Sequence, residues 1–289
     1  MRLVILAPKD FQPLAMLRKA RIRYRSDGDA DAVLVAPRSA SELRARWSRM
    51  PSLRWVHALS AGVEPLLFPE LVESDVVLTN GRGIFAPALA EWVVGAILYF
   101  AKGFARLTRQ KRWEPFHVER VEGQTVGILG YGSIGRAIGE RCAALGMQVI
   151  GVSRHEGSLD EMLRASDYVV VCTPLTDETR GLIGRREIAK MRRNAVLVNV
   201  GRGAVVDEAA LVRALQSHRI KGAALDVFWT EPLPRRHPLW SLDNVLISPH
   251  GADYTADSHL RAMQCFLDNL ARFRRGEPLQ NVVDKRAGY

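Results

Sequence analysis

The chain of 289 residues is long enough for two domains that each bury a core of their own. Its hydrophobic share of 47% and charged share of 25% are ordinary for a globular protein and exclude a chain built of low-complexity sequence. The net charge of +10 comes mostly from arginines dispersed along the chain, without a clustered basic arm. We therefore expect no specific nucleic-acid partner, and a positive field that attracts small anions.

The apolar stretches and the cysteines bear on location. Residues 3–7 are too short for the apolar core of a signal peptide, and residues 92–101 are too short to cross a membrane. The three cysteines have no metal-binding or redox spacing. These features predict a soluble cytoplasmic protein with no membrane partner and no metal site.

The first part of the chain predicts a small α/β unit. Short helical segments, such as residues 39–49, separate its buried strands. The strands are expected at Leu3–Ala7, Ala32–Ala36, Leu53–His57 and Val76–Thr79. Residues 86–110 then predict one long helix that connects this unit to the next.

From residue 125 onward, β-branched runs alternate with stretches of helical periodicity. This alternation predicts a doubly wound parallel sheet, because parallel strands need crossover connections. One of these helices is expected to begin after the N-cap Asp207, and the last helix is expected at residues 255–275. The strands are expected at Thr125–Leu129, Gln148–Val152, Tyr168–Cys172, Val196–Val200, Ala223–Val227 and Val245–Ser248.

A glycine-rich motif follows the first of these strands and opens a helix. Its residues are Gly130, Tyr131, Gly132, Ser133, Ile134 and Gly135. Gly130 permits the sharp turn, Gly132 lets a pyrophosphate approach the backbone, and Gly135 lets the helix pack closely on the sheet. The helix N-terminus offers unpaired N–H groups to the anion. The motif therefore predicts a site for a dinucleotide cofactor.

Three ionisable residues follow three different strands of this sheet. Arg202 follows the strand 196–200, Glu231 follows 223–227, and His250 follows 245–248. Ligands of open α/β sheets bind beyond the carboxyl ends of the strands, so we expect these side chains to converge there. Taken singly, each fits a structural role, but together at equivalent strand ends they favour catalysis.

The three side chains suit hydride transfer to a keto acid. Arginine grips a carboxylate with two parallel hydrogen bonds and polarises a neighbouring carbonyl. Histidine exchanges the proton that accompanies the hydride. A glutamate beside it stabilises the imidazolium and holds its tautomer.

With these motifs the chain resembles the D-isomer-specific 2-hydroxyacid dehydrogenase family, especially its glyoxylate/hydroxypyruvate reductase-like members. The match covers nearly the whole chain, from residues 55–63 through the C-terminal helix, and its most specific stretches are residues 197–207, 224–232 and 237–251. The resemblance implies an NAD(P)-dependent oxidoreductase that acts on a small 2-keto acid or D-2-hydroxy acid. It also implies a Rossmann nucleotide-binding domain, residues 91–269, inserted into a smaller flavodoxin-like substrate domain, residues 1–90 and 270–289.

Residue roles follow from the same resemblance. Arg202 is implied to bind the substrate carboxylate and keto group, with His250 as the acid/base and Glu231 as the family's glutamate beside it. The backbone of Ala61 and Gly62 is implied to contact the substrate. Asp226 also fits a structural cap, an alternative that stays open beside a contact to the nicotinamide. The positions implied to line the cofactor are Thr173, Pro174, Val200, Gly201 and Asp226.

The chain departs from the family pattern in two places. NAD-dependent members usually carry an acidic residue after the second strand of the nucleotide-binding sheet, whereas this chain has Ser153, Arg154 and His155. A carboxylate repels a 2′-phosphate, while hydroxyl and guanidinium groups bind one, so NADP(H) is favoured, with NAD(H) as the alternative. Trp92 stands where relatives often have histidine, so the identity of the substrate is left open.

The resemblance leaves assembly and two other functions open. Relatives are typically homodimers, and Trp113 lies where an exchanged arm would form, so a homodimer is expected. The alternatives are a dehydrogenase of another donor, such as phosphoglycerate, and a nucleotide-sensing binding protein similar to the family's corepressors.

Overall fold

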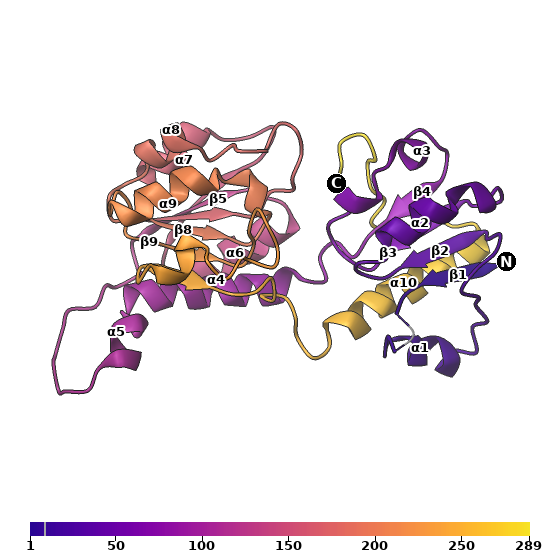
Figure 1. Cartoon of the computed structure of the whole chain (residues 1–289), viewed down its shortest axis with the longest axis horizontal. Coiled ribbons are helices and arrows are strands. Elements are labelled where there is room, and N and C mark those ends of the chain that lie inside the picture. The colour runs from indigo at the N-terminus through magenta and orange to yellow at the C-terminus, as the bar shows by residue number, and fades with distance from the viewer. Residues whose placement is uncertain (9) are drawn as a thin grey trace. The chain divides into compact units, whose positions relative to one another are not determined.

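The computed structural model of this protein describes residues 1–8 and 10–289, which form two compact units. The first unit comprises Met1–Phe85 and Thr255–Tyr289, and the second comprises Ala86–Tyr254 (Figure 1). The sequence placed the second boundary between the domains at residue 270, inside the last helix. In the structure this helix, α10 (Ser258–Arg275), belongs entirely to the first unit. The reason is its packing, because Met263 and Phe266 lie in one apolar cluster with strands of that unit.

The first unit is built on a parallel sheet with strands in the order β1-β2-β3-β4. Arg25 makes a further parallel bridge to β1 on its free side. Counting Arg25 as the second strand gives the order 2-1-3-4-5, which is the flavodoxin-like order expected from the resemblance. Val282 pairs antiparallel with Thr79 at the opposite edge, so the C-terminal segment completes the sheet. The strands are β1 (Leu3–Leu6), β2 (Ala32–Val35), β3 (Trp55–Ala58) and β4 (Val77–Thr79).

Helices cover this sheet on both faces. Alternate residues of β1 enter different clusters: Val4 and Leu6 lie in one, Leu3 and Ile5 in the other. The apolar face of α10 packs in the second cluster. The helices and short 3₁₀ turns of the unit are α1 (Leu14–Lys19), α2 (Ala40–Arg46), η1 (Trp47–Arg49), η2 (Glu64–Leu66), α3 (Pro69–Val72) and α10.

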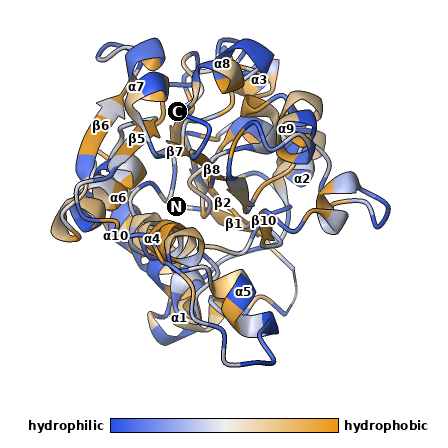
Figure 2. Ribbon diagram, turned by 90° about the vertical axis from the view of Figure 1, so that its left-hand side faces the viewer, coloured by the Kyte–Doolittle hydropathy of each residue, from blue (hydrophilic) through white to orange (hydrophobic). Residues whose placement is uncertain are grey.

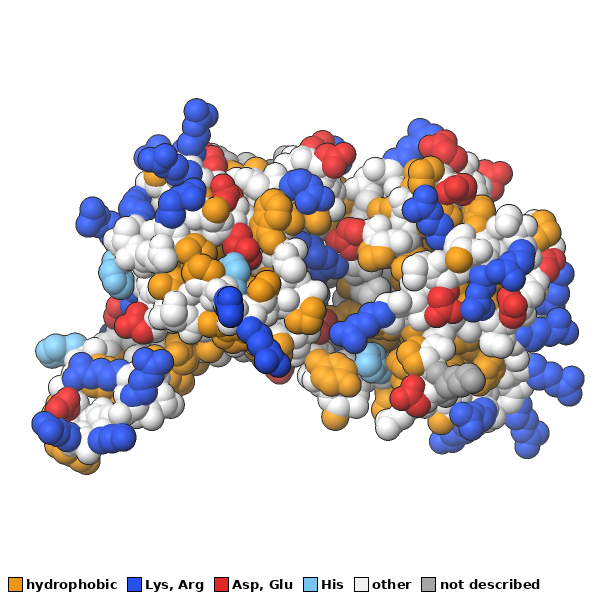
Figure 3. Space-filling model, viewed as in Figure 1, with side chains coloured by type: hydrophobic (Ala, Val, Ile, Leu, Met, Phe, Trp, Pro, Cys, Tyr) orange, Lys and Arg blue, Asp and Glu red, His pale blue; other side chains and the backbone are white. Residues whose placement is uncertain are grey.

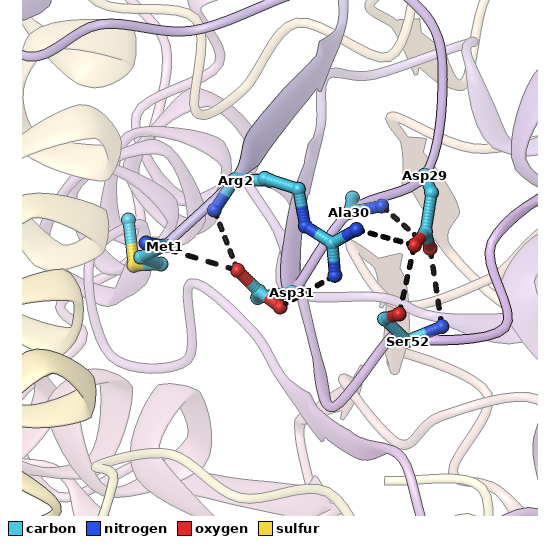
Figure 4. A network of polar contacts seen from close by, with 6 residues as sticks. All are labelled: Met1, Arg2, Asp29, Ala30, Asp31 and Ser52. Atoms are coloured by element: carbon cyan, nitrogen blue, oxygen red, sulfur yellow. Dashed lines mark hydrogen bonds and ion pairs between the residues drawn. The ribbon is translucent and has the colours of Figure 1, made fainter.

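A polar network ties together the loops at the amino ends of three strands (Figure 4). The guanidinium of Arg2, which precedes β1, contacts Asp29 at 2.5 Å and Asp31 at 3.0 Å. Asp29 also accepts hydrogen bonds from the Ser52 hydroxyl at 2.7 Å and the Ser52 backbone N–H at 3.1 Å. Because Arg2 is 42% exposed and the two carboxylates remain partly exposed, the network holds the loops in place more than it adds stability.

The second unit holds a parallel sheet in the order β10-β9-β8-β7-β5-β6. The order reverses between β5 and β7, and ligands of doubly wound sheets bind at such a point. Most of its strands lie within the predicted ranges, and β9 begins one position earlier, at Gly222. The strands are β5 (Thr125–Leu129), β6 (Gln148–Val152), β7 (Tyr168–Val171), β8 (Val196–Asn199), β9 (Gly222–Leu225) and β10 (Val245–Ile247).

The helices of the second unit surround this sheet. The carboxylate of Asp207 accepts a hydrogen bond from the Ala210 N–H at 2.9 Å, which confirms the predicted N-cap of α9. The elements are α4 (Ala86–Ala101), α5 (Phe104–Arg109), α6 (Ser133–Ala144), α7 (Leu159–Ala165), α8 (Arg185–Lys190), η3 (Gly203–Val205), α9 (Glu208–Gln216) and η4 (Pro238–Ser241).

The prediction of one helix over residues 86–110 is wrong. The largely hydrophobic α4 (Figure 2) packs on α6. The helix is then interrupted at Gly103, whose φ of 64° lies in the left-handed region. A Cβ there would lie 2.8 Å from the ring of Phe116, so glycine also makes room for this side chain. No helix of the described chain is long and apolar enough to cross a membrane.

An arm, residues 110–124, follows α5 and forms no helix or strand in the described structure. Lys and Arg side chains gather on it (Figure 3), and Trp113 is 95% exposed. The arm leaves the unit before the chain enters β5 (Figure 1).

Candidate active site

The glycine turn joins β5 to α6 at the point where the strand order reverses. Gly130 has a φ of 100°, and a Cβ there would lie 2.6 Å from the backbone nitrogen of Thr173, the second residue after β7. A Cβ at Gly135 would lie 2.5 Å from the carbonyl oxygen of Gly130. Both positions therefore admit only glycine, as the motif predicts.

The start of α6 leaves room for an anion. Gly132 is the N-cap of the helix, and a Cβ built on it would meet nothing within 4 Å. Ser133 beside it is exposed, and Ile134 is half-buried. A tight glycine turn followed by an open helix N-terminus fits the pyrophosphate of a dinucleotide.

Tyr131, in the middle of the motif, is held by packing. A Cβ at Gly151 of β6 would lie 2.4 Å from the ring of Tyr131, and one at Gly139 of α6 would lie 2.8 Å from its hydroxyl. The ring therefore lies directly on two positions without side chains. The guanidinium carbon of Arg136 lies 5.4 Å from the ring centroid, within range of a cation–π interaction.

The residues after β7 and β8 meet next to this turn. A Cβ at Gly201 would lie 2.8 Å from the carbonyl oxygen of Thr173, so the two loops are in contact. Val200 is buried, and its N–H donates to Val171 of β7. Pro174 accepts a hydrogen bond from the Thr179 hydroxyl at 2.7 Å, which closes a turn after β7.

Arg202 lies at the carboxyl end of β8. Its guanidinium donates to the Gly201 carbonyl at 2.8 Å. The buried Asn199 side chain accepts from the Gly201 N–H and donates to the Arg202 carbonyl, each at 3.1 Å. Sequence reasoning missed Asn199, which fixes the backbone on both sides of Gly201.

Glu231 and His250 are in direct contact. Glu231 Oε2 lies 2.7 Å from His250 Nδ1, and Glu231 Oε1 accepts the Phe228 N–H at 3.0 Å. The side chains are 35% and 46% exposed, so the pair is reachable from solvent. Because β8, β9 and β10 are neighbours in the sheet, Arg202 and this pair leave three adjacent strand ends. The structure thus brings the predicted histidine and glutamate together.

Asp226 holds the loop that carries His250. Its buried carboxylate accepts the N–H groups of Gly251 at 2.9 Å and Ala252 at 3.2 Å, and the Ser248 hydroxyl also donates to it. The Asp226 carbonyl accepts the His250 N–H at 2.8 Å. His250 itself has a φ of 51°, an uncommon conformation for a residue with a side chain. These contacts match the structural alternative for Asp226, and its cofactor contact stays a prediction.

Asp253 is an acidic residue of this loop that sequence reasoning missed. Burial raises its pKa, with Asp226 acting in the same direction, while His250 and Arg202 oppose the shift. Asp253 therefore lies within electrostatic range of Arg202 and His250 in the candidate site. Its position three residues after His250, in a loop between a strand and a helix, was the available signal.

The loop after β6 carries the residues expected at the cofactor ribose. Ser153 and Arg154 are exposed there, and no residue between Ser153 and His155 carries a carboxylate. Arg154 Nη2 lies 2.8 Å from Glu178 Oε1, in the turn after β7. Sequence reasoning missed this contact, because Glu178 lies in a polar stretch that reads as a solvated turn.

Ala61 and Gly62 belong to the first unit, in the loop after β3. The Ser60 hydroxyl donates to the Gly62 carbonyl at 2.7 Å, and the Asn80 side chain donates to the Ala61 carbonyl at 2.6 Å. These contacts with the two carbonyls hold the loop in place. The substrate contact of Ala61 and Gly62 stays a prediction.

The parallel sheet and the glycine turn at its switch point define a Rossmann domain that binds a dinucleotide. The sequence model of the D-isomer specific 2-hydroxyacid dehydrogenase NAD-binding domain matches residues 94–252. A glyoxylate reductase of Aeropyrum pernix is 36% identical over 294 aligned residues, covering 93% of this chain and 85% of the relative.

Two solved structures are similar over the whole chain. The NADPH-dependent glyoxylate/hydroxypyruvate reductase of Sinorhizobium meliloti, in complex with NADP and sulfate, has a TM-score of 0.88 and 29% identity, with 100% of both chains covered. A D-isomer specific 2-hydroxyacid dehydrogenase of Xanthobacter autotrophicus, in complex with NADPH and MES, has a TM-score of 0.87 and 34% identity, covering 100% of this chain and 99% of that one.

The chain therefore belongs to the D-isomer specific 2-hydroxyacid dehydrogenase family. It is an NAD(P)-dependent oxidoreductase that transfers a hydride between the nicotinamide cofactor and a small keto or hydroxy acid. The resemblance stated from its motifs is confirmed.

Proposed function

We propose that this enzyme reduces a small 2-keto acid of the glyoxylate or hydroxypyruvate type, with Arg202, Glu231 and His250 as its catalytic residues. The single observation that carries the proposal is the 2.7 Å contact between His250 and Glu231, which follow the two strands next in order to the strand that carries Arg202. The relatives named as glyoxylate reductases favour this substrate class over phosphoglycerate or a corepressor role.

Each of these side chains has a definite task. The Arg202 guanidinium binds the substrate carboxylate and polarises the keto group. With Nδ1 held by Glu231, Nε2 of His250 is the nitrogen that donates the proton to the keto oxygen. Glu231 keeps the ring oriented and stabilises the imidazolium before the transfer. The bound cofactor supplies the hydride that reduces the keto carbon.

The cofactor is held by the backbone of residues 130–135 and by the loops after β7 and β8. Thr173 and Gly201 are in contact beside Gly130. We therefore assign the sides of the cofactor site to the residues of these two loops, Thr173, Pro174, Val200 and Gly201. On the substrate side, we assign the backbone N–H groups of Ala61 and Gly62 to the substrate carboxylate.

A histidine variant with a matched control tests the assignment. His250→Ala is expected to lower kcat by about a hundredfold to ten-thousandfold, as for loss of a general acid. His218→Ala is the control, because His218 is exposed and its φ of 49° is nearly the same as that of His250. Arg202→Ala should mainly raise KM for glyoxylate. Wild-type turnover in His250→Ala would contradict the proposal.

We further propose that the enzyme prefers NADPH. Ser153 and Arg154 follow β6 where a carboxylate would repel a 2′-phosphate, and two similar structures carry NADP or NADPH. The ratio of kcat/KM for the two cofactors tests this preference. A ratio in favour of NADH would overturn it.

The exposed arm supports a homodimer. Trp113, at 95% exposure, and Val118, at 51%, are apolar side chains on residues 110–124 that a second copy would cover. Sedimentation of wild type and Trp113→Glu tests this, since loss of the aromatic contact should shift the dimer toward monomer. The cytoplasmic location stays a prediction.

A further inference from the structure

An ion pair joins the loops that follow β6 and β7. The Arg154 guanidinium on the first loop lies 2.8 Å from the Glu178 carboxylate on the second. β6 and β7 are the two neighbours of β5 in the sheet. The pair therefore spans the carboxyl end of β5, where the glycine turn begins.

Hydrogen bonds hold the backbone on both sides of the pair, and on the Arg154 side the Ser153 N–H donates to the Glu156 carbonyl at 2.8 Å. Glu178 lies in a turn fixed by Thr179, whose hydroxyl accepts the Thr176 N–H at 2.8 Å and donates to the Pro174 carbonyl at 2.7 Å. Both charged side chains remain open to solvent, with 50% of Arg154 and 65% of Glu178 exposed. An ion pair this exposed is weak, so a stronger anion can replace the carboxylate.

The chemistry of the cofactor identifies that anion. The 2′-phosphate of NADPH is a dianion with three acceptor oxygens, and NADH has only a hydroxyl at the same position. Binding of NADPH through Arg154 must therefore break or share the contact with Glu178. It also brings the phosphate near a second negative charge. Neither cost falls on NADH.

We propose that Glu178 is a specificity-determining residue that competes with the 2′-phosphate for Arg154 and so limits the preference for NADPH. The inference rests on the proposed preference for NADPH. The carboxylate keeps the guanidinium neutralised while the ribose site holds no phosphate. Removing this carboxylate should increase the affinity for NADPH selectively, because it removes a competing partner of Arg154 and a charge that repels the phosphate.

The test measures binding, with no substrate present. Dissociation constants of NADPH and NADH are measured by calorimetry for wild type, Glu178→Gln and Asp177→Asn. Asp177 is the matched control, since it is an exposed carboxylate in the same turn but next to the pair. Glu178→Gln should bind NADPH about two- to fivefold more tightly, which is the change in affinity expected for an exposed ion pair. Its affinity for NADH should stay unchanged. Asp177→Asn should change neither constant by as much.

A second probe isolates the phosphate. 2′,5′-ADP should gain affinity in Glu178→Gln by the same factor as NADPH, and 5′-AMP should not. The gain should shrink at high salt, since exposed charges are screened. Unchanged NADPH affinity, an equal gain for NADH, or an equal gain in Asp177→Asn would overturn the role of Glu178.

The same measurements distinguish a failure of the proposed NADPH preference from a failure of the proposed role of Glu178. If wild type binds NADH more tightly than NADPH, and Arg154→Ala weakens neither, then Arg154 is no phosphate ligand and the preference itself is wrong. If wild type prefers NADPH and Glu178→Gln changes nothing, only the competition is refuted.

Discussion

His57 should make the first unit sensitive to mild acid. It lies on β3 with no exposed surface, and its Nδ1 is 2.7 Å from the Thr79 hydroxyl, which also accepts the Trp55 indole N–H at 2.8 Å. Within the described chain, its Nε2 is buried without a hydrogen-bond partner. Burial lowers the pKa of His57 from 6.5 to about 3, because the charged ring would lose its hydration.

The sign and size of the effect follow from linkage. The unfolded chain takes up a proton below pH 6.5, whereas the folded unit does not until about pH 3. Stability contributed by the neutral ring is therefore complete above pH 6.5 and is lost as the pH falls toward 3. With about 1.4 kcal/mol for each unit of pKa, lowering the pH from about 7 to about 5 should cost about 2 kcal/mol.

The comparison of wild type with His57→Gln measures this contribution. Urea unfolding at several pH values gives the slope for each protein, and titration of the remaining groups cancels in the difference. Amide hydrogen exchange of β3 reports on the first unit alone, which matters because the chain has two units. Parallel pH profiles for the two proteins would show that His57 is not a buried neutral group, and the reasoning would be refuted.

Two further predictions concern the glycine turn and the C-terminal segment. Gly130→Ala should weaken NADPH binding by about tenfold or more in a fluorescence titration, because its Cβ would meet the backbone of Thr173; wild-type affinity would contradict this packing. Lys285→Met should destabilise the first unit by about 1 to 3 kcal/mol, since Nζ donates to the Leu71, Ser74 and Val76 carbonyls. Thermal unfolding measures that loss, and an unchanged midpoint would rule out a stabilising role.

The core of the fold could be predicted because parallel strands are buried on both faces. Their unbroken apolar runs, such as Leu3–Leu6 and Tyr168–Val171, stand out from the flanking helices. The break after α4 could not be predicted, because it depends on Gly103 meeting Phe116 from a later segment. The membership of α10 in the first unit likewise depends on packing against distant strands.

The candidate site was predictable where one local rule sets a residue type. The glycine motif and the three strand ends follow such rules. The roles of Asp226 and Glu178 depend instead on hydrogen bonds to residues far along the chain, such as Gly251 and Arg154. No local pattern distinguishes a carboxylate with such partners from one that points into water.

The packing of the Tyr131 ring against two glycines limits how this sequence can vary. The ring rests on Gly139 and Gly151, which lie outside the phosphate-binding motif yet have no space for a methyl group. A mutation at either position would push the aromatic side chain out of place, and a small residue at position 131 would leave a hollow beneath the turn. We expect these positions to drift as a set through evolution, and a designer who grafts the turn onto another sheet must transplant the bare backbone beneath it as well.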